Sequence, residues 1–405
     1  MKIALLSEKY TPDIGGLAIS TERLARLLAS AGHKVRVFSP TPSTTLRTSL
    51  NLLPSEKQTL PSSGVSVTRF GAHKRVDDTL VDWFELIVEE HKREPFDILQ
   101  GYFLPQAGFV ATYAGKYLNV PSVVSIRGND IERAAFDPSR FSHVMYALQN
   151  TDVVTTNATE LVKKAKAFIE REIILIPNGI DTEYFKPMER NDVLADALNL
   201  NHASAAVPGG EEDALSNIPV VGFVGELRAK KGLKTLLSAY AQVNKQHASA
   251  LLIIGEVRQG EDKQAFDEFR ISNPDSRIII TGRISHNDLP AYYSLIDVFV
   301  HPSLRDGMPN AVLEAMACEK AVIATPVGGI LDVLEDGKNG VIVNVNDANM
   351  LAGKIHELLV NAEKRISLGK NAREIIVNRF TPAKELEANL EVYRKIGLRI
   401  NPVVE

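Results

Sequence analysis

Short apolar segments alternate with amphipathic segments along the first half of the chain. KIALLSE (2–8) predicts a buried strand, residues 21–31 have apolar positions at helical spacing, and KVRVFSP (34–40) predicts the next strand. Further apolar runs, each ending at turn residues, lie at 97–102, 122–128, 152–158 and 173–179. Strands that alternate with helices in this way favour a parallel sheet with helices on both faces.

A second series of the same kind follows, with apolar runs at 219–227, 250–256, 277–283, 297–303, 321–327 and 340–344. Two tracts interrupt the pattern. Residues 40–64 predict a long mobile loop, and residues 201–217, rich in Ala, Gly and acidic residues, predict a flexible connection or surface loop. We expect two α/β domains at 1–185 and 186–380, and a C-terminal helix (381–405) placed to pack back on the first domain.

Composition agrees with this organisation. At 405 residues the chain is too long for one ordinary core. Its single cysteine, Cys318, excludes an internal disulfide and a Cys-based zinc cluster, and fits a reducing compartment. The apolar run at the N-terminus is too short for a signal peptide, and no segment approaches the roughly 20 apolar residues of a membrane span. We therefore expect a cytoplasmic protein, and its net charge of -4 does not predict nucleic-acid binding.

The segment HPSLRDGMPNAVLEAMAC (301–318) contains two carboxylates, Asp306 and Glu314, with seven residues between them. It follows an apolar strand, and Pro309 and Asn310 are typical of a helix start. This order predicts a loop carboxylate and a helix carboxylate at the carboxyl edge of a sheet, where α/β proteins bind ligands. The alternative is a surface Asp and a Glu that stabilises the helix start.

Two further turns lie between a strand and a helix. In residues 225–232, Arg228 and Lys231 stand at a helix start, where cations oppose the helix dipole, so an anionic ligand such as a diphosphate is indicated. In residues 13–16, the paired glycines Gly15 and Gly16 let the backbone approach a ligand. A solvated basic turn and a tight glycine turn are the respective alternatives.

Other strand ends carry weaker signals. Arg127 and Asp130 either pair with each other or face a substrate, and the backbone of residues 282–284 could read the edge of a nucleobase. The isolated histidines are interpreted as structural: His143, His286 and His301. The strand-end loops contain no DxD or HxH pattern, so side chains and helix ends must neutralise any phosphate there.

Together these segments resemble the retaining glycosyltransferases of family 4, which have the GT-B fold. In the family's order, the matching segments are Gly15-Gly16, Arg127-Gly128, Pro177-Asn178-Gly179-Ile180-Asp181, Gly225 to Gly232, Gly282-Arg283-Ile284, Asp306 to Ala317, and Gly328-Gly329. The resemblance implies two Rossmann-like domains that face each other across an interdomain cleft. It also implies transfer of a sugar from a nucleotide-sugar donor, bound by the C-terminal domain, to an acceptor bound by the N-terminal domain. The anomeric configuration would be kept.

The resemblance assigns roles to the residues that match the family's motifs. Catalytic roles fall to Asp306, Arg127, Arg228 and Lys231. Donor binding falls to Gly15, Gly16, Gly225, Arg228, Lys231, Gly282, Arg283, Ile284, Asp306, Gly307, Met308, Pro309, Asn310 and Glu314. Acceptor binding falls to Gly16, Arg127 and Asp130. No metal and no other cofactor is expected.

The acceptor would be a sugar or a lipid-linked sugar, in the synthesis of cell-envelope polysaccharide or glycolipid. A peripheral contact with the inner face of a membrane remains an open alternative, and the oligomeric state is left open.

Three positions depart from the family pattern. Asp306 replaces the usual Glu, Arg127 replaces the usual His before Gly, and Glu226 replaces the usual Arg, with Arg228 as a substitute guanidinium. Other functions therefore remain alternatives. A sugar-nucleotide epimerase or phosphorylase would keep the same fold, and a non-catalytic protein would bind a sugar nucleotide and act through a partner.

Overall fold

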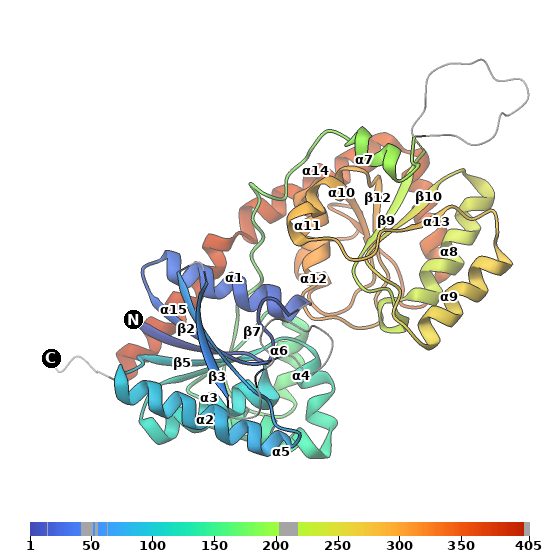
Figure 1. Ribbon diagram of the computed structural model, residues 1–405. Helices are drawn as coiled ribbons and strands as arrows, with labels where there is room; N and C mark the ends of the chain where they lie inside the picture. The colour runs from blue at the N-terminus through green and yellow to red at the C-terminus, as the bar shows by residue number, and fades with distance from the viewer. Residues whose placement is uncertain (14, 42–51, 53–55, 63, 202–217, 401–405) are drawn as a thin grey trace, which may run out of the picture. The chain divides into compact units, whose positions relative to one another are not determined.

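The computed structural model describes residues 1–13, 15–41, 52, 56–62, 64–201 and 218–400. It divides the chain into two compact units. Unit 1 consists of Met1–Gly179 and Pro382–Glu405, and unit 2 of Ile180–Thr381. The boundary between the units lies between Gly179 and Ile180, before the boundary expected after residue 185. Phe185 accordingly belongs to the core of unit 2. Each unit is an α/β sheet covered by helices, which confirms the expected fold class (Figure 1).

Unit 1 contains an eight-stranded sheet in the order β3-β4-β2-β1-β5-β6-β7-β8, parallel except for β3. Its strands are β1 (Lys2–Leu6), β2 (Lys34–Pro40), β3 (Lys57–Ser62), β4 (Val65–Phe70), β5 (Ile98–Tyr102), β6 (Ser122–Ile126), β7 (Val153–Thr156) and β8 (Ile173–Leu175). Its helices are α1 (Gly16–Ser30), α2 (Val76–Arg93), α3 (Phe109–Leu118), α4 (Asn129–Glu132), α5 (Pro138–Asn150), α6 (Thr159–Lys166) and α15 (Pro382–Ile400), with a π-helical turn η1 (Leu104–Gly108) and a 3₁₀ turn η2 (Ala134–Phe136).

Unit 2 contains a parallel six-stranded sheet in the order β11-β10-β9-β12-β13-β14. Its strands are β9 (Val220–Val224), β10 (Ala250–Ile254), β11 (Ile278–Ile280), β12 (Val298–His301), β13 (Ala321–Ala324) and β14 (Val341–Ile342). Its helices are α7 (Asp192–Ala197), α8 (Leu233–Gln246), α9 (Glu261–Ser272), α10 (Leu289–Ser294), α11 (Asn310–Ala317), α12 (Ile330–Val333), α13 (Ala348–Val360) and α14 (Ala362–Arg379), with 3₁₀ turns η3 (Ala229–Lys231) and η4 (His286–Asp288).

The central strands β1, β5, β6 and β10 are buried at every position because both of their faces are covered. In β1, Ile3 and Leu5 pack in one core cluster with α1 and α15, while Ala4 and Leu6 pack in another with α2 and α3. The strand β10 divides its residues between two clusters in the same way. Continuous apolar runs are typical of such parallel strands.

One expectation for unit 1 is wrong. Residues 57–62, assigned from the sequence to a mobile loop, form the edge strand β3, which pairs antiparallel with β4. The segment KQTLPS lacks an alternating apolar pattern, since an edge strand needs little burial and tolerates Pro61. Pro40, the first residue of that predicted loop, belongs to β2. Residues 42–51, 53–55 and 63 of the loop, and 202–217 of the second predicted loop, lie outside the described residues.

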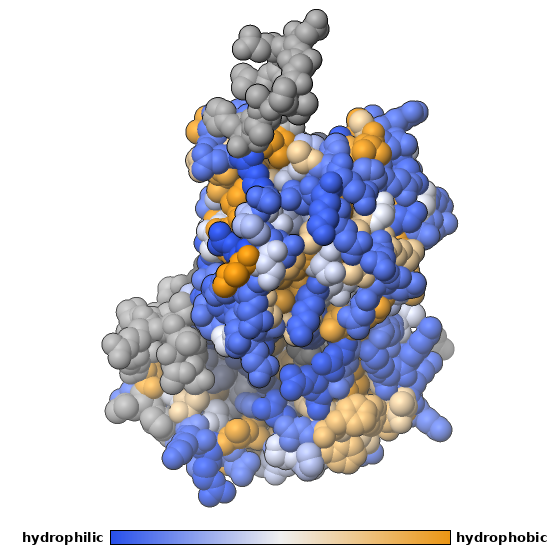
Figure 2. Space-filling view, turned by 90° about the vertical axis from the view of Figure 1, so that its right-hand side faces the viewer, coloured by the Kyte–Doolittle hydropathy of each residue, from blue (hydrophilic) through white to orange (hydrophobic). Residues whose placement is uncertain are grey.

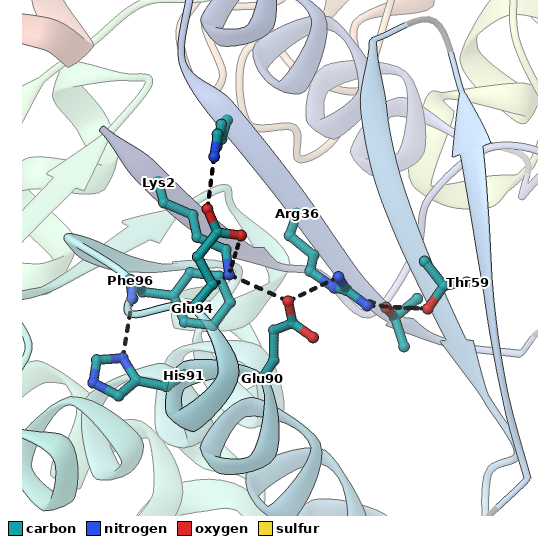
Figure 3. A network of polar contacts seen from close by, with 9 residues as sticks. Lys2, Arg36, Thr59, Glu90, His91, Glu94 and Phe96 are labelled. Atoms are coloured by element: carbon teal, nitrogen blue, oxygen red, sulfur yellow. Dashed lines mark hydrogen bonds and ion pairs between the residues drawn. The ribbon is translucent and has the colours of Figure 1, made fainter.

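A charged network fastens α2 to the amino ends of the central strands (Figure 3). Glu90 of α2 accepts hydrogen bonds from Lys2 Nζ at 3.2 Å and from Arg36 Nη1 at 2.9 Å, and Glu94 adds a second ion pair to Lys2 at 3.2 Å. These contacts lie at the edge of the sheet opposite the strand ends that carry the candidate site, so we assign them to stability.

The surface gives no sign of a membrane-spanning helix. Within the described ranges, no helix is both long enough and apolar enough to cross a bilayer. Figure 2 shows a face on which hydrophilic residues predominate and apolar residues form small groups.

Candidate functional site

The loop after β12 holds Asp306 in a charged cluster. The Asp306 carboxylate accepts a hydrogen bond from the Lys231 ammonium and lies 3.0 Å from His301 Nε2. Burial alone would raise the pKa of Asp306, but Lys231 and His301 outweigh it and hold that pKa well below its usual range. The carboxylate is therefore ionised at any working pH and paired with a cation.

His301 supports this cluster from inside. Burial lowers the pKa of His301, so its ring is neutral, and Nε2 lies 3.0 Å from both Asp306 Oδ2 and Ser303 Oγ. Its Nδ1 makes no hydrogen bond to any residue that the structure describes. The proton is accordingly assigned to Nε2, where it is shared with the carboxylate. The sequence indicated a structural histidine but did not indicate this contact.

Glu314 lies on α11 and is only 3% exposed. Its Oε1 is 3.1 Å from His286 Nε2, and its Oε2 is 2.9 Å from the Tyr293 hydroxyl. Burial and the neighbouring carboxylate raise the pKa of Tyr293 well above its ordinary value, so the phenol stays protonated. Glu314 is thus held by a phenol and an imidazole, and one contact to each oxygen leaves acceptor capacity for a ligand.

The cationic turn contacts the Asp306 loop through its backbone. Leu304 donates its N–H to the Lys230 carbonyl at 2.9 Å, and a Cβ on Gly232 would lie 2.0 Å from the Pro302 carbonyl oxygen. Arg228 pairs with Glu226 at 3.0 Å, on the half-exposed side of the turn. Both predicted phosphate-binding cations therefore hold carboxylates that a ligand could displace.

The remaining donor-binding candidates of unit 2 also follow its strands. Gly225, after β9, has φ 127° and Gly282, after β11, has φ 72°, with open space where a Cβ would be. Arg283 is exposed and pairs with Glu256 at 2.9 Å, and Ile284 packs against the core. Gly307 accepts the Gly329 N–H at 2.7 Å. Met308 is buried, Pro309 precedes α11, and Asn310 opens it.

In unit 1, Gly15 and Gly16 open α1, with φ 121° at Gly15 and no atom within 4 Å of a Cβ added at either position. The neighbouring loop is fixed by Arg69, whose guanidinium donates to the Thr11 carbonyl at 2.8 Å and to Asp13 at 3.2 Å. Sequence analysis did not indicate Arg69, because it lies on β4, the strand that follows the predicted loop.

The Arg127 guanidinium and the Asp130 carboxylate have different hydrogen-bond partners. The Arg127 guanidinium lies 3.8 Å from the centre of the Tyr102 ring and donates to Asn178 Oδ1 at 3.0 Å. The Asp130 carboxylate is buried and accepts the backbone N–H groups of Arg127 and Gly128 at 2.9 and 2.7 Å, although burial raises its pKa to about 6. The contacts of Asp130 thus order the loop that carries Arg127.

Glu8, which the sequence did not single out, also lies at this edge of unit 1. It follows β1 and accepts the Gln106 N–H at 3.1 Å, from a π-helical turn entered through Phe103 with φ 119°. Burial raises the pKa of Glu8 to about 7. A positive φ at a bulky residue is strained and often marks functional backbone.

A metal-binding arrangement does not appear in the part of the chain that the structure describes. There, no three His, Cys, Asp or Glu side chains come together in a way that could hold an ion. The side chains at the strand ends are a cation–carboxylate pair and a second carboxylate held by Tyr293 and His286 in unit 2, and the Arg127 loop in unit 1.

Comparison with known proteins gives consistent matches. The family model described as "Glycosyltransferase Family 4" matches residues 14–184, and that described as "Glycosyl transferases group 1" matches residues 211–375. The capsular polysaccharide biosynthesis glycosyltransferase CapM of Staphylococcus aureus is 27% identical over 333 residues, which cover 77% of this chain and 80% of CapM.

Two solved structures show the same fold over nearly the whole chain. Sucrose-phosphate synthase from Thermosynechococcus elongatus matches with a TM-score of 0.78 and 22% identity, covering 98% of this chain and 99% of that one. HepE from Anabaena, in complex with UDP-glucose, matches with a TM-score of 0.78 and 19% identity, covering 98% and 100%. At these identities the two structures establish the fold alone.

Proposed function

The chain belongs to the group 1, family 4 glycosyltransferases, and we propose that it moves a sugar from a nucleotide-diphosphate-sugar to an acceptor hydroxyl with retention of the anomeric configuration. The observation that carries the proposal is the Lys231–Asp306 ion pair. Lys231 lies on the same turn as Arg228, and Asp306 lies on the same strand-loop-helix segment as Glu314. HepE, a protein of the same fold, binds UDP-glucose, which supports a nucleotide-sugar donor.

Each side chain has a task that its contacts allow. Lys231 and Arg228 would exchange their carboxylate partners for the diphosphate and stabilise the charge that grows on the leaving group. Asp306 would then accept hydroxyl groups of the donor sugar, and Glu314 those of the ribose. Since these cations neutralise the diphosphate, we propose that the reaction needs no metal and no other cofactor.

In the proposed step the bond from the anomeric carbon to the diphosphate oxygen breaks, and a bond from that carbon to the acceptor oxygen forms on the same face. The proton of the acceptor hydroxyl passes to the departing phosphate oxygen, so charge and atoms balance. Arg127, Gly16 and the loop ordered by Asp130 are proposed to bind the acceptor on unit 1.

The name of CapM supports a role in cell-envelope polysaccharide or glycolipid synthesis. A lipid-linked acceptor, a cytoplasmic location and a peripheral membrane contact belong to the same proposal. Co-sedimentation with vesicles of phosphatidylglycerol, compared with vesicles of phosphatidylcholine, tests the contact. Equal recovery with both, at the level without vesicles, would refute it.

A thermal-shift panel of nucleoside diphosphates and sugar nucleotides tests the donor. A ligand at 100 times its Kd should stabilise the protein by about 2.7 kcal/mol. The matching sugar nucleotide should be hydrolysed slowly without an acceptor, and nuclear magnetic resonance of the transfer product should show the donor's anomeric configuration. If no ligand of the panel raised the melting temperature, the proposal would be refuted.

The alternative functions are outcomes of the same work. An epimerase would convert the sugar nucleotide without an acceptor, and a phosphorylase would require inorganic phosphate. A binding-only protein would show a thermal shift without turnover. An Asp306→Ala variant that turns over as fast as the unaltered protein would remove Asp306 from the mechanism.

A further inference from the structure

Among the residues that the structure describes, the hydrogen bonds to the Glu314 carboxylate leave one acceptor position on each oxygen. An ionised carboxylate offers about four lone-pair positions. His286 uses one on Oε1 and Tyr293 uses one on Oε2. The position that remains on each oxygen can accept one of the neighbouring 2′- and 3′-hydroxyls of a ribose.

The two donors differ in their exposure. Tyr293 is fully buried in the core of unit 2, so it fixes the inner oxygen. The His286 side chain is 39% exposed and lies on η4, which follows the Gly282–Ile284 segment. Of the two donors to Glu314, the imidazole of His286 is therefore the one that solvent reaches.

The orientation of the imidazole is itself fixed. The His286 ring packs edge-on against Phe185, with 5.2 Å between centroids, and Phe185 packs against Tyr293 with 6.0 Å between centroids. Tyr184 donates its hydroxyl to the Asn287 carbonyl and anchors the same turn. A Glu314 oxygen that accepts at this contact requires a proton on His286 Nε2.

We infer that His286 is a positioning residue for ribose recognition, because it orients the Glu314 carboxylate so that both free acceptor positions face the 2′- and 3′-hydroxyls. The inference rests on the proposed function, since it concerns the nucleoside part of the donor. It differs from the sequence interpretation, which treated His286 as structural only. In the proposed function Lys231 and Arg228, on other elements, bind the diphosphate. We therefore expect His286 to affect binding of the ribose alone.

Isothermal titration with UDP and 2′-deoxy-UDP tests the inference, or with the corresponding pair for the base that the panel selects. In His286→Phe, which keeps the ring packing on Phe185, UDP should bind roughly tenfold more weakly, the loss of one hydrogen bond to a charged group. The Kd of 2′-deoxy-UDP should change less than about threefold, because that ligand lacks one of the hydroxyls that Glu314 reads. The preference for the ribonucleotide should therefore shrink.

Two variants serve as controls. His286→Gln can place an amide N–H near the position of Nε2 and should restore most of the preference. His247→Phe changes a histidine after the C-terminal end of α8, at the opposite edge of the sheet, where it contacts His356, and should leave both affinities unchanged.

The outcomes separate the inference from the proposed function. An equal weakening of both ligands in His286→Phe would show a merely structural role and overturn the inference. Unchanged affinities, or a Gln variant that behaves like the Phe variant, would overturn it as well. If the unaltered protein binds no nucleoside diphosphate, the proposed function fails first and the inference fails with it.

Discussion

Replacing Asp306 by Asn should separate donor binding from transfer. The side chains keep nearly the same shape, but the variant loses a carboxylate that Lys231 and His301 keep ionised. In the protein without ligand, this carboxylate holds the Lys231 ammonium. The substitution therefore releases a cation that a diphosphate would otherwise have to take from Asp306.

The magnitude follows from the burial of the pair. The Asp306 and Lys231 side chains are 17% and 21% exposed, so the pair is screened by little water. A hydrogen bond to a charged group contributes about 1.5–3 kcal/mol. We expect the free energy of unfolding to fall by about 1–3 kcal/mol, because Lys231 can turn toward solvent and recover part of the loss.

Binding and turnover should move in opposite directions. The affinity for the nucleoside diphosphate should stay the same or rise by up to roughly tenfold, since Lys231 has lost its competing partner. The rate of transfer should fall about 100-fold or more, the effect of removing one group that stabilises developing charge or holds the reacting sugar.

Isothermal titration with the diphosphate, urea unfolding and a transfer assay measure the three quantities. Asp275→Asn is the matched control, since it changes an exposed carboxylate of the same unit. Weaker diphosphate binding in Asp306→Asn, together with an unchanged transfer rate, would refute the reasoning. Such a result would place Asp306 in phosphate binding and outside the chemistry.

Three more predictions concern other parts of the molecule. Glu385 of α15 is buried and accepts from a guanidinium on α1 at 2.7 Å and a backbone N–H at 2.8 Å, so Glu385→Ala should cost about 3–5 kcal/mol in urea unfolding. A loss below about 1 kcal/mol in the free energy of unfolding would contradict this cost of breaking a buried ion pair. Gly328→Ala should lower transfer activity more than Gly337→Ala. Both glycines have positive φ, but a Cβ on Gly328 would lie 2.1 Å from the Gly307 carbonyl oxygen whereas one on Gly337 meets nothing; equal activities would count against a clash at the Asp306 loop. Burial raises the pKa of Glu8 from 4.5 to about 7, so between these pH values the folded state binds more protons than the unfolded state and stability falls as pH rises, by up to about 3 kcal/mol. In Glu8→Gln this decline between pH 5 and 8 should disappear from the urea-unfolding profile, and its persistence would assign the pH dependence to other groups.

The sequence predicts the core of each unit well for a physical reason. Strands such as β1 and β10 are buried on both faces, so their apolar runs are continuous and their ends coincide with turn residues. The edge strand β3 does not need to be buried on both faces, and its polar sequence therefore resembles that of a loop. Burial restricts a strand to mostly apolar residues, whereas pairing at a sheet edge uses backbone groups and restricts the residue types little.

The candidate site divides in the same way. Its loops were predictable because carboxyl ends of parallel strands meet at one edge of a sheet. The contacts between those loops were not, since Lys231 and Asp306 lie 75 positions apart and His286 and Glu314 lie 28 apart. Which cation meets which carboxylate depends on side-chain packing that neither local motif determines.

Asp306 and Glu314, the two carboxylates of segment 301–318, differ in the partners that hold them. Glu314 is held by the neutral phenol of Tyr293 and by His286, whereas Asp306 is compensated by the ammonium of Lys231. Under the proposed function, a diphosphate that draws Lys231 away would leave Asp306 with free acceptor positions as the attached sugar arrives. A free sugar would meet an Asp306 that is already paired with Lys231. One cation would thereby couple recognition of the phosphate to recognition of the sugar, and we expect the intact donor to bind better than either of its parts.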